Sequence, residues 1–434
     1  MTRSPTTPGV DARTPRRRQV LAALGATLLL GACALPGAQP AAPRGVSGAH
    51  LDAFMRRVEA DSTAGRLPGA VLLVARDGRL QYARAVGVQD PASGRPMARD
   101  AIFRIYSMTK PIVSIAAMQL VEDGRLRIGD PVWRYVPEIR GMKVAVEKPG
   151  PDGRPAIVDR VASPREMTVQ DLLRHTSGLT YQPFGRSAVK DEYAKVDMTP
   201  ASRQLPFDLT EMARRLGTLP LAYVPGTTWD YSISTDLLGL VVERASGMKL
   251  DAYLQQRILG PLGMKDTAFW VPPDKQARLA EAYPVDPDSK AKVELLDVRR
   301  PPVLLAGGGG MVSTADDYLR FVQMLLNGGE LDGTRIVSRK TVEYMASDHL
   351  GAIGRGPAYL PGPGHGFGLG FAVRTAAGES SWYGSVGDYY WGGYAGTAFW
   401  VDPKERLVAV WMMQGPGQSG QYRPLLRAAV YTAL

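Results

Sequence analysis

Ser107 and Lys110 stand at a spacing that suits nucleophilic catalysis, within the run FRIYSMTKP at residues 103–111. Three residues are close to one helical turn, so both side chains would lie on one face of a helix. An apolar run follows at 112–121. The sequence therefore predicts a helix that begins near Ser107 and ends near Gly124, where glycine suits a C-terminal stop.

The chemistry that this pair would support is attack by an activated serine. Serine is a poor nucleophile at its own pKa and needs a neighbouring base. A lysine can be that base where burial or nearby cations lower its pKa, and the apolar helix behind Lys110 suits such burial. The same spacing also fits a helix-capping serine beside a solvated lysine, so the rest of the chain must decide.

The composition is that of a globular protein that can bury a large core: 434 residues, 45% hydrophobic and 22% charged. The net charge is +10, but residues 1–32 hold five arginines and one aspartate, which leaves +6 for the remainder. This excess is dispersed and has no aromatic-interleaved basic stripe, so we expect no nucleic-acid partner. No metal-ligand spacing such as His-Glu-x-x-His occurs, and we expect neither a metal nor another cofactor.

The N-terminal residues are typical of a targeting segment. The run RRRQVL at 16–21 has a twin-arginine pattern, and the apolar stretch that ends at Leu30 is short for a membrane span. Cys33 is the only cysteine, so no intrachain disulfide can form, and it follows Leu-Gly-Ala as in a bacterial lipobox. We therefore predict an export signal at 1–32 and lipidation at Cys33, with ordinary signal cleavage there as the alternative. The mature protein would be periplasmic or attached to a membrane through its lipid.

The order of predicted elements indicates an α+β fold. Residues 33–48, rich in Ala, Pro and Gly, would form a flexible tether. Strands are predicted near both ends of the chain and helices mostly between them. This pattern suggests an antiparallel sheet flanked by helices and built from 49–125 and 300–434, with an inserted, mainly helical domain at 126–299. The active site would lie in the groove between the two parts.

Local patterns locate the strands and the loops that would border the site. Asp77-Gly78 is a strong signal for a tight turn between two strands. Residues 180–205 are polar and loop-like, and with 345–365 they would border the substrate and set its chain length. Strands are predicted at 70–75, 80–88, 364–373, 380–384, 396–401 and 407–413.

Several short motifs follow one another in a specific order. They are SMTK at 107–110, HTSGL at 175–179, PG at 225–226 ahead of YS at 231–232, GGGGMVS at 307–313 and WGG at 391–393. In order and spacing, over roughly residues 50–430, they resemble the serine β-lactamase and penicillin-binding-protein superfamily on its class C side. The resemblance is greatest to the family VIII carboxylesterases. It implies a β-lactamase-like fold and cleavage of short-chain carboxylic esters, with a small-molecule ester as the partner.

The resemblance also implies a role for each matching residue. Ser107 would attack the ester carbonyl and form an acyl-enzyme. Lys110 and Tyr231 would move the protons, and either of them fits the general base because coupled groups titrate as a pair. The backbone N–H groups of Ser107 and Tyr394 would form the oxyanion hole, where one aimed donor contributes about 3 kcal/mol.

Two departures from the β-lactamase pattern bear on the substrate. Ile233 stands where those enzymes have an asparagine, and it cannot hydrogen-bond the side-chain amide of an antibiotic. Trp391 stands where they have a lysine that pairs with the antibiotic's carboxylate. Losing such a contact costs about 1.5–3 kcal/mol, or roughly tenfold or more in affinity. With Gly392 and Gly393 beside it, Trp391 would form an apolar substrate wall that favours neutral esters over anionic β-lactams.

Other functions fit parts of the sequence. A β-lactamase or a D-alanyl-D-alanine peptidase acting on cell-wall peptides would agree with export. A non-catalytic penicillin-binding-like protein would keep the scaffold, but it would not need Ser107, Lys110 and Tyr231 intact. An α/β-hydrolase is disfavoured because no Gly-x-Ser-x-Gly elbow occurs and only four histidines are present. His175 lacks a local acidic partner, and we interpret it as structural.

The lipobox prediction can be tested in a bacterial host by palmitate labelling. Wild-type protein is expected to incorporate label, and the Cys33→Ala variant is expected to incorporate none because its only thiol is gone. An unlabelled wild-type protein in the exported fraction would contradict lipidation and favour ordinary signal cleavage.

Overall fold

The computed structural model describes residues 45–196 and 204–434, and these belong to one compact unit. The predicted signal at 1–32, Cys33 and most of the tether lie outside the described residues, as do 197–203 of the predicted loop. The domain boundaries after residues 125 and 299 stay a prediction. Within the described residues, no helix is long and apolar enough to cross a membrane.

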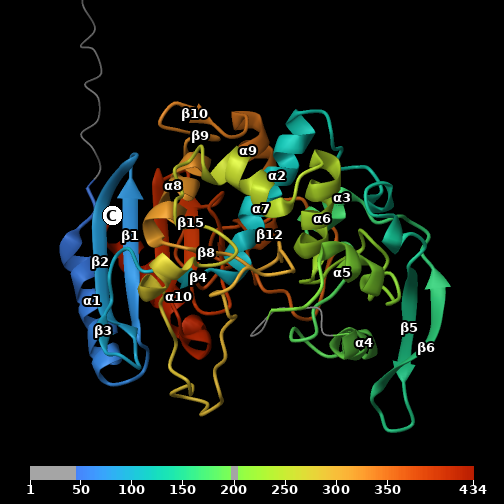
Figure 1. Ribbon diagram of the computed structural model, residues 1–434, viewed down its shortest axis with the longest axis horizontal. Coiled ribbons are helices and arrows are strands. Elements are labelled where there is room, and N and C mark those ends of the chain that lie inside the picture. Colours follow the sequence, from blue (N-terminus) through green and yellow to red (C-terminus); the bar gives the residue numbers. More distant parts are fainter. Residues whose placement is uncertain (1–44, 197–203) are drawn as a thin grey trace, which may run out of the picture. The chain divides into compact units, whose positions relative to one another are not determined.

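An eight-stranded antiparallel sheet carries the fold (Figure 1). Its order is β12-β13-β14-β15-β16-β1-β2-β3, so strands from both ends of the sequence meet where β16 pairs with β1. This confirms the predicted α+β sheet built from both ends of the chain. The strands are β1 Gly69–Arg76, β2 Arg79–Asp90, β3 Arg95–Pro96, β12 His365–Phe367, β13 Ala372–Arg374, β14 Tyr389–Gly392, β15 Ala398–Asp402 and β16 Leu407–Met413.

Strand β1 is buried along its whole length because its side chains alternate between two cores. Leu73 belongs to the core on the side of helices α2 and α8, and Leu72 belongs to the core beneath α1 and α10. A strand that is covered on both faces explains the continuous apolar run at 70–75. The turn after it has positive φ at both Asp77 and Gly78, as the tight hairpin turn requires.

Helices cover both faces of the sheet. One face is covered by α1 (Gly48–Thr63) and α10 (Ser419–Thr432), and the other by α2 (Thr109–Glu122) and α8 (Ala315–Leu326). Helix α6 packs against α2 and also against α3, α5 and α7. The remaining helices are α3 Val169–Leu173, α4 Ala188–Val196, α5 Leu209–Leu216, α6 Ser234–Ser246, α7 Leu250–Leu254 and α9 Arg339–Met345.

Short two-stranded ladders complete the described part of the chain. The longest is a hairpin that projects at the edge of Figure 1. A shorter ladder pairs the segment before Ser107 with the segment after the glycine run at 307–310. These ladders are β5 Lys143–Pro149 with β6 Pro155–Ala162, β4 Phe103–Arg104 with β8 Val312–Ser313, β7 Thr228–Trp229 with β11 Gly354–Arg355, and β9 Glu330–Leu331 with β10 Thr334–Arg335.

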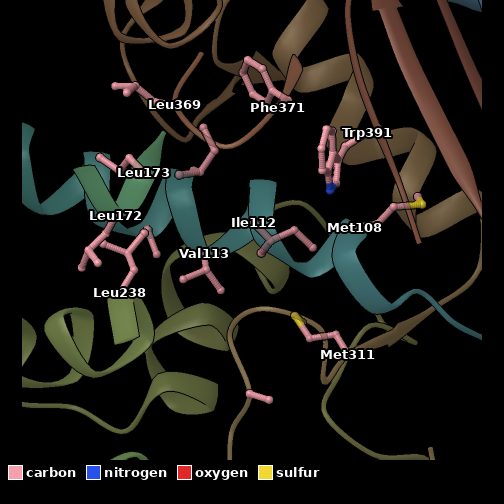
Figure 2. Close-up of a cluster of buried hydrophobic side chains, with 14 of the residues drawn as sticks. Met108, Ile112, Val113, Leu172, Leu173, Leu238, Met311, Leu369, Phe371 and Trp391 are labelled. Atoms are coloured by element: carbon pink, nitrogen blue, oxygen red, sulfur yellow. The ribbon is translucent and has the colours of Figure 1, made fainter. Parts of the chain in front are cut away.

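Helix α2 passes through the middle of a buried apolar cluster (Figure 2). Ile112 and Val113 lie between Leu238 of α6 and Trp391 of β14, and the residues of α2 from Thr109 to Leu120 are all buried. Close packing on every side fixes the position of such a helix. Ser107 lies in a single 3₁₀ turn just before it, so the helix begins two residues later than the spacing predicts.

The predicted strand at 380–384 is wrong, because residues 380–382 form bends, 383–384 have no regular structure, and the strand comes later, at Tyr389–Gly392. A side chain replaces the missing strand partner. Arg374 donates to the carbonyl oxygens of Trp382 and Tyr383 at 2.9 and 3.2 Å. Backbone groups that are satisfied in this way do not need a sheet ladder.

The predicted loop at 180–205 contains a helix, α4, which the polar composition concealed. Lys190 of α4 is buried, and its ammonium lies 3.1 Å from the carboxylate of Asp230 and 2.5 Å from the hydroxyl of Thr180. A charge of this kind is tolerated inside a protein only when it is paired. The pair therefore ties α4 to the residue that precedes Tyr231.

Because β1 is buried on both faces, replacing a leucine of β1 should destabilise the protein far more than replacing an exposed leucine of the adjacent strand β2. Leu72→Ala removes a side chain with no exposed surface and should lower the free energy of unfolding by about 2–5 kcal/mol. Leu80→Ala on β2 is the matched control, because Leu80 is 42% exposed and should change it by less than about 0.5 kcal/mol. Urea unfolding of the variants measures both values, and equal losses would contradict the packing.

Candidate active site

The structure brings Ser107, Lys110 and Tyr231 into hydrogen-bonding contact. The Tyr231 hydroxyl donates to Ser107 Oγ at 2.7 Å, and Lys110 Nζ lies 3.3 Å from the same oxygen. The three residues come from the 3₁₀ turn before α2, from α2 and from the segment before α6. A serine hydroxyl that contacts two groups able to exchange protons has the geometry of an activated nucleophile.

The backbone before the nucleophile is held in an unusual conformation. Tyr106 has a φ of +42°, in the left-handed region that residues with a side chain rarely adopt. Its hydroxyl accepts the N–H of Leu296 at 2.9 Å, and its ring packs edge-on against Tyr394 with centroids 5.4 Å apart. Such strain persists only where the surroundings over-determine it, and it is common at functional sites. These contacts fix the direction in which Ser107 faces.

A buried network that sequence reasoning missed surrounds Lys110. Lys110 Nζ donates to the Gly308 carbonyl at 2.6 Å, and the Gly308 N–H donates to Asp236 at 2.9 Å. The Tyr181 hydroxyl donates to the other oxygen of Asp236 at 2.8 Å. Burial raises the pKa of Asp236, while the charge on Lys110 acts to lower it. The available signal was an aspartate in the first turn of the predicted helix, directly before the apolar run at 237–242 and five residues after Tyr231.

Aromatic rings enclose Tyr231 on several sides. The ring centroids of His175, Phe184 and Tyr181 lie 4.9, 5.1 and 5.4 Å from its own. Trp391 also contacts it, and the indole Nε1 donates to the Tyr231 hydroxyl oxygen at 3.3 Å. Trp391 is therefore more than an apolar wall, because its N–H is placed to stabilise negative charge on that oxygen.

His175 and Ser177 make their hydrogen bonds away from the nucleophile. His175 Nδ1 lies 3.1 Å from Ser232 Oγ, and Ser177 Oγ lies 2.7 Å from Ser234 Oγ. Burial, together with the positive charge on Lys110, holds the pKa of His175 well below its usual range. A neutral histidine behind the Tyr231 ring fits a structural role.

The turn after β14 places two backbone donors beside the site. In the described part of the chain, neither the Ser107 N–H nor the Tyr394 N–H donates to a protein acceptor. Gly393 lets this turn approach the nucleophile segment, because a Cβ there would collide with the Ile105 carbonyl. Arg423 Nη2 donates to the Gly393 carbonyl at 2.6 Å, and that carbonyl shares a peptide group with the Tyr394 N–H. A cation on the oxygen side polarises the group and makes its N–H a stronger donor.

A cavity of about 410 Å³ opens at Ser107 and extends to α10. Its lining is mostly aromatic and apolar, as ligand pockets usually are. Ile233 is not among the lining residues, because it is buried in the core at the start of α6. The lining includes the predicted residues Ser107, Tyr231, Trp391, Gly392, Gly393 and Tyr394, and also Phe184, Tyr390, Arg423 and Arg427.

Comparisons with known proteins match the chain to one family. A family model described as Beta-lactamase matches residues 54–432. Esterase EstB of Burkholderia gladioli is 34% identical over 387 residues, which cover 84% of this chain and 91% of EstB. Lovastatin esterase of Penicillium rubens is 29% identical over 373 residues, covering 81% of this chain and 89% of its own. The solved structure of EstCE1, described as a hydrolase with promiscuous acyltransferase activity, superposes with a TM-score of 0.70 at 28% identity, covering 88% and 99% of the two chains.

The network around Lys110 predicts that Asp236 supports the site through its charge. Asp236→Asn removes a carboxylate that faces Lys110 through Gly308. Losing one charged hydrogen bond costs about 1.5 kcal/mol or more, so kcat should fall about tenfold or more. As pH falls through the raised pKa of Asp236, the wild-type carboxylate becomes protonated and ester hydrolysis should fall, whereas Asp236→Asn should lack this acid limb.

The matched control is Asp317→Asn, which changes another aspartate whose pKa burial raises, in the first turn of α8. Asp317 accepts hydrogen bonds from Asp266 and Thr267 and does not line the cavity. Its substitution should leave the pH profile of kcat unchanged. Identical profiles for wild type and Asp236→Asn would contradict the role of Asp236.

Proposed function

This chain belongs to the Beta-lactamase family, and from that premise we propose that it cleaves carboxylic esters through an acyl-enzyme on Ser107. Relatives of the same fold are named esterases and acyltransferases, and the chain is a hydrolase with a carboxylesterase or acyltransferase role. The observation that carries the finer proposal is the 2.7 Å contact between the Tyr231 hydroxyl and Ser107 Oγ, beside Lys110.

Acylation follows from the contacts of Ser107. The proton on Ser107 Oγ passes to the oxygen of deprotonated Tyr231, either directly or through Lys110, which passes one proton on to Tyr231 as it accepts one from Ser107, while Oγ bonds to the ester carbonyl carbon. The carbonyl oxygen becomes an oxyanion, which the N–H groups of Ser107 and Tyr394 bind. The bond to the alcohol oxygen then breaks, and the alcohol leaves with the proton that Tyr231 held.

Deacylation repeats these steps with water. Tyr231 removes a proton from the water that attacks the acyl carbon, and the same two N–H groups bind the second oxyanion. The bond between the acyl carbon and Ser107 Oγ breaks, and the proton returns to Oγ as the acid leaves. The indole N–H of Trp391 stabilises the charged Tyr231 oxygen in both half-reactions.

The site favours esters over β-lactams. Trp391 replaces the lysine that would pair with a lactam carboxylate, and its side chain is held against Tyr231. Ile233 offers no hydrogen bond and lies in the core. The cavity of about 410 Å³ has room for a short acyl chain and an alcohol group together.

We also propose that the protein is exported and is attached to a membrane through lipidated Cys33.

Three classes of substrate test the proposal. Wild type should hydrolyse p-nitrophenyl acetate and butyrate far faster than nitrocefin or a D-Ala-D-Ala peptide, because only the esters need no carboxylate contact at Trp391. Ser107→Ala should lose at least about 10³-fold in kcat, since it removes the nucleophile. Mass spectrometry of the quenched wild-type reaction should show an added acyl group on Ser107.

Ser177→Ala is the control for this experiment, because it removes a serine that is hydrogen-bonded to Ser234 and not to Ser107. It should keep ester hydrolysis. Full activity in Ser107→Ala would refute the nucleophile. Faster turnover of nitrocefin or of the peptide would assign the chain to the β-lactamases or peptidases, and turnover of no substrate would favour a binding protein.

A further inference from the structure

The cavity that begins at Ser107 continues across strand β14 to a second face. Successive side chains of a strand point to opposite faces of its sheet. Trp391 points towards Tyr231, whereas Tyr390 and Gly392 lie on the face that α10 covers. We call this part the inner end of the cavity, and it is lined by Tyr390, Trp400, Arg423, Leu426 and Arg427.

Positive charge exceeds negative charge around the inner end. Asp388 is fully buried and pairs with two arginines, Arg374 at 3.1 Å and Arg427 at 3.0 Å. A third arginine, Arg423, lines the same space and has no acidic partner among the described residues. Asp388 therefore balances part of the charge of Arg374 and Arg427, and no carboxylate is paired with Arg423 among the described residues.

Arg423 is bonded to backbone and leaves part of its guanidinium available. Nη2 donates to the carbonyl oxygens of Gly393 at 2.6 Å and Thr397 at 3.1 Å. Its Nε is buried and has no hydrogen-bond partner, while part of the side chain stays open to the cavity. Burial lowers the pKa of Arg423 to about 10, so the group stays charged at neutral pH. A guanidinium that is partly buried against an apolar wall and has no counter-ion is a favourable place for an anion to bind.

The glycine at position 392 makes this arrangement sterically feasible. A Cβ on Gly392 would stand 2.6 Å from Arg423 Nη2 and 2.7 Å from its central carbon. Any side chain there would displace the guanidinium from the strand. Gly392 was predicted to lie beside the substrate, and in the structure it lines the cavity and also leaves room for the Arg423 guanidinium.

We propose that the inner end of the cavity binds a carboxylate of the substrate, so that the preferred esters carry one carboxylate several bonds away from the ester group that is cleaved. The inference rests on the proposed esterase function. One unpaired guanidinium matches one negative charge, and its planar N–H groups suit a carboxylate. The apolar and aromatic lining between Ser107 and Arg423 suits the chain that joins the two groups.

This inference changes the expectation that Trp391 favours neutral esters. Because Trp391 stands in place of a lysine, it leaves no cation at that position on the face of β14 that looks toward Ser107 and Tyr231. Arg423 of α10 supplies a cation on the opposite face of the same strand, beside Gly392, which is the next residue after Trp391. The preference thus concerns where the carboxylate lies, because an acid group next to the cleaved bond meets the indole and a distant one reaches the guanidinium.

Isosteric ester pairs test the inference. The first pair is the p-nitrophenyl monoester of adipic acid and its terminal amide, which places the charge on the acyl side. The second is 4-carboxyphenyl acetate and 4-carbamoylphenyl acetate, which places it on the alcohol side. In wild type, kcat/KM should be at least about tenfold higher for the carboxylate in one of these pairs, as a charge-assisted contact implies. A ratio of one or less in both pairs would overturn the inference.

Variants locate the preference. Arg423→Gln should bring the ratio close to one, and Arg423→Lys should retain part of it. Arg423 also holds the turn at Gly393, so its loss should lower the activity on both esters of a pair. The ratio of their kcat/KM values should not change through this structural role, and it therefore reports on the anion site. Arg355→Gln is the matched control, since it removes an exposed arginine outside the cavity lining. An unchanged ratio in Arg423→Gln would also overturn the inference.

A second variant covers the case in which Arg423→Gln does not fold. Ser419 lines the cavity and is the first residue of α10, where an aspartate suits the helix dipole. Ser419→Asp introduces a competing carboxylate and should lower the ratio, whereas Ser419→Asn should not. Equal ratios in these two variants would count against an anion site.

A binding measurement separates this inference from the esterase proposal. In Ser107→Ala, 10 mM hexanoate should raise the unfolding temperature more than hexanamide does, and Ser107→Ala/Arg423→Gln should lose the difference. If no ester is hydrolysed but hexanoate stabilises, the esterase proposal fails and the anion site stands. If esters are hydrolysed but hexanoate and hexanamide act alike, the anion site fails and the esterase proposal stands.

Discussion

The buried ammonium of Lys110 is the group on which the rest of the site depends. A cation inside a protein must be paired and hydrogen-bonded, or it loses its charge. Here the Gly308 carbonyl and Ser107 Oγ accept from it, and the rings of Tyr231 and Tyr181 lie 4.6 and 5.4 Å from it. Each of these groups belongs to a different segment. The requirement to satisfy one charge therefore brings together the segments that form the catalytic constellation.

Strand β14 applies the same physics on two faces. On one face, Trp391 binds the Tyr231 hydroxyl; on the other, Gly392 leaves room for Arg423. The turn that follows the strand carries the Tyr394 N–H, and its Gly393 carbonyl is bound by the same arginine. One short strand thus orients the proton-transfer residue, supports a backbone donor and borders the part of the cavity where positive charge exceeds negative charge.

Much of the fold could be predicted because its signals are local. The apolar run at 70–75 and the Asp77-Gly78 turn are read from neighbouring residues, and the structure confirms both. The prediction failed at 380–384 and at 180–205. In both places a distant side chain decides the local conformation: Arg374 satisfies the carbonyls of the first, and Asp230 pairs with a lysine in the helix of the second. Composition alone does not record such partners.

The sequence by itself determined the order of the motifs and the spacing of Ser107 and Lys110, because one helical turn relates residues that are three apart whatever the surroundings. Only the tertiary structure decided which charges are paired. Asp236 accepts the N–H of Gly308, which is 72 residues away in the sequence. Arg423 donates to the carbonyl of Gly393, 30 residues away, and among the described residues no carboxylate pairs with it. The balance of charge in a buried space depends on every segment that borders it, and the chain reveals that balance only when it is folded.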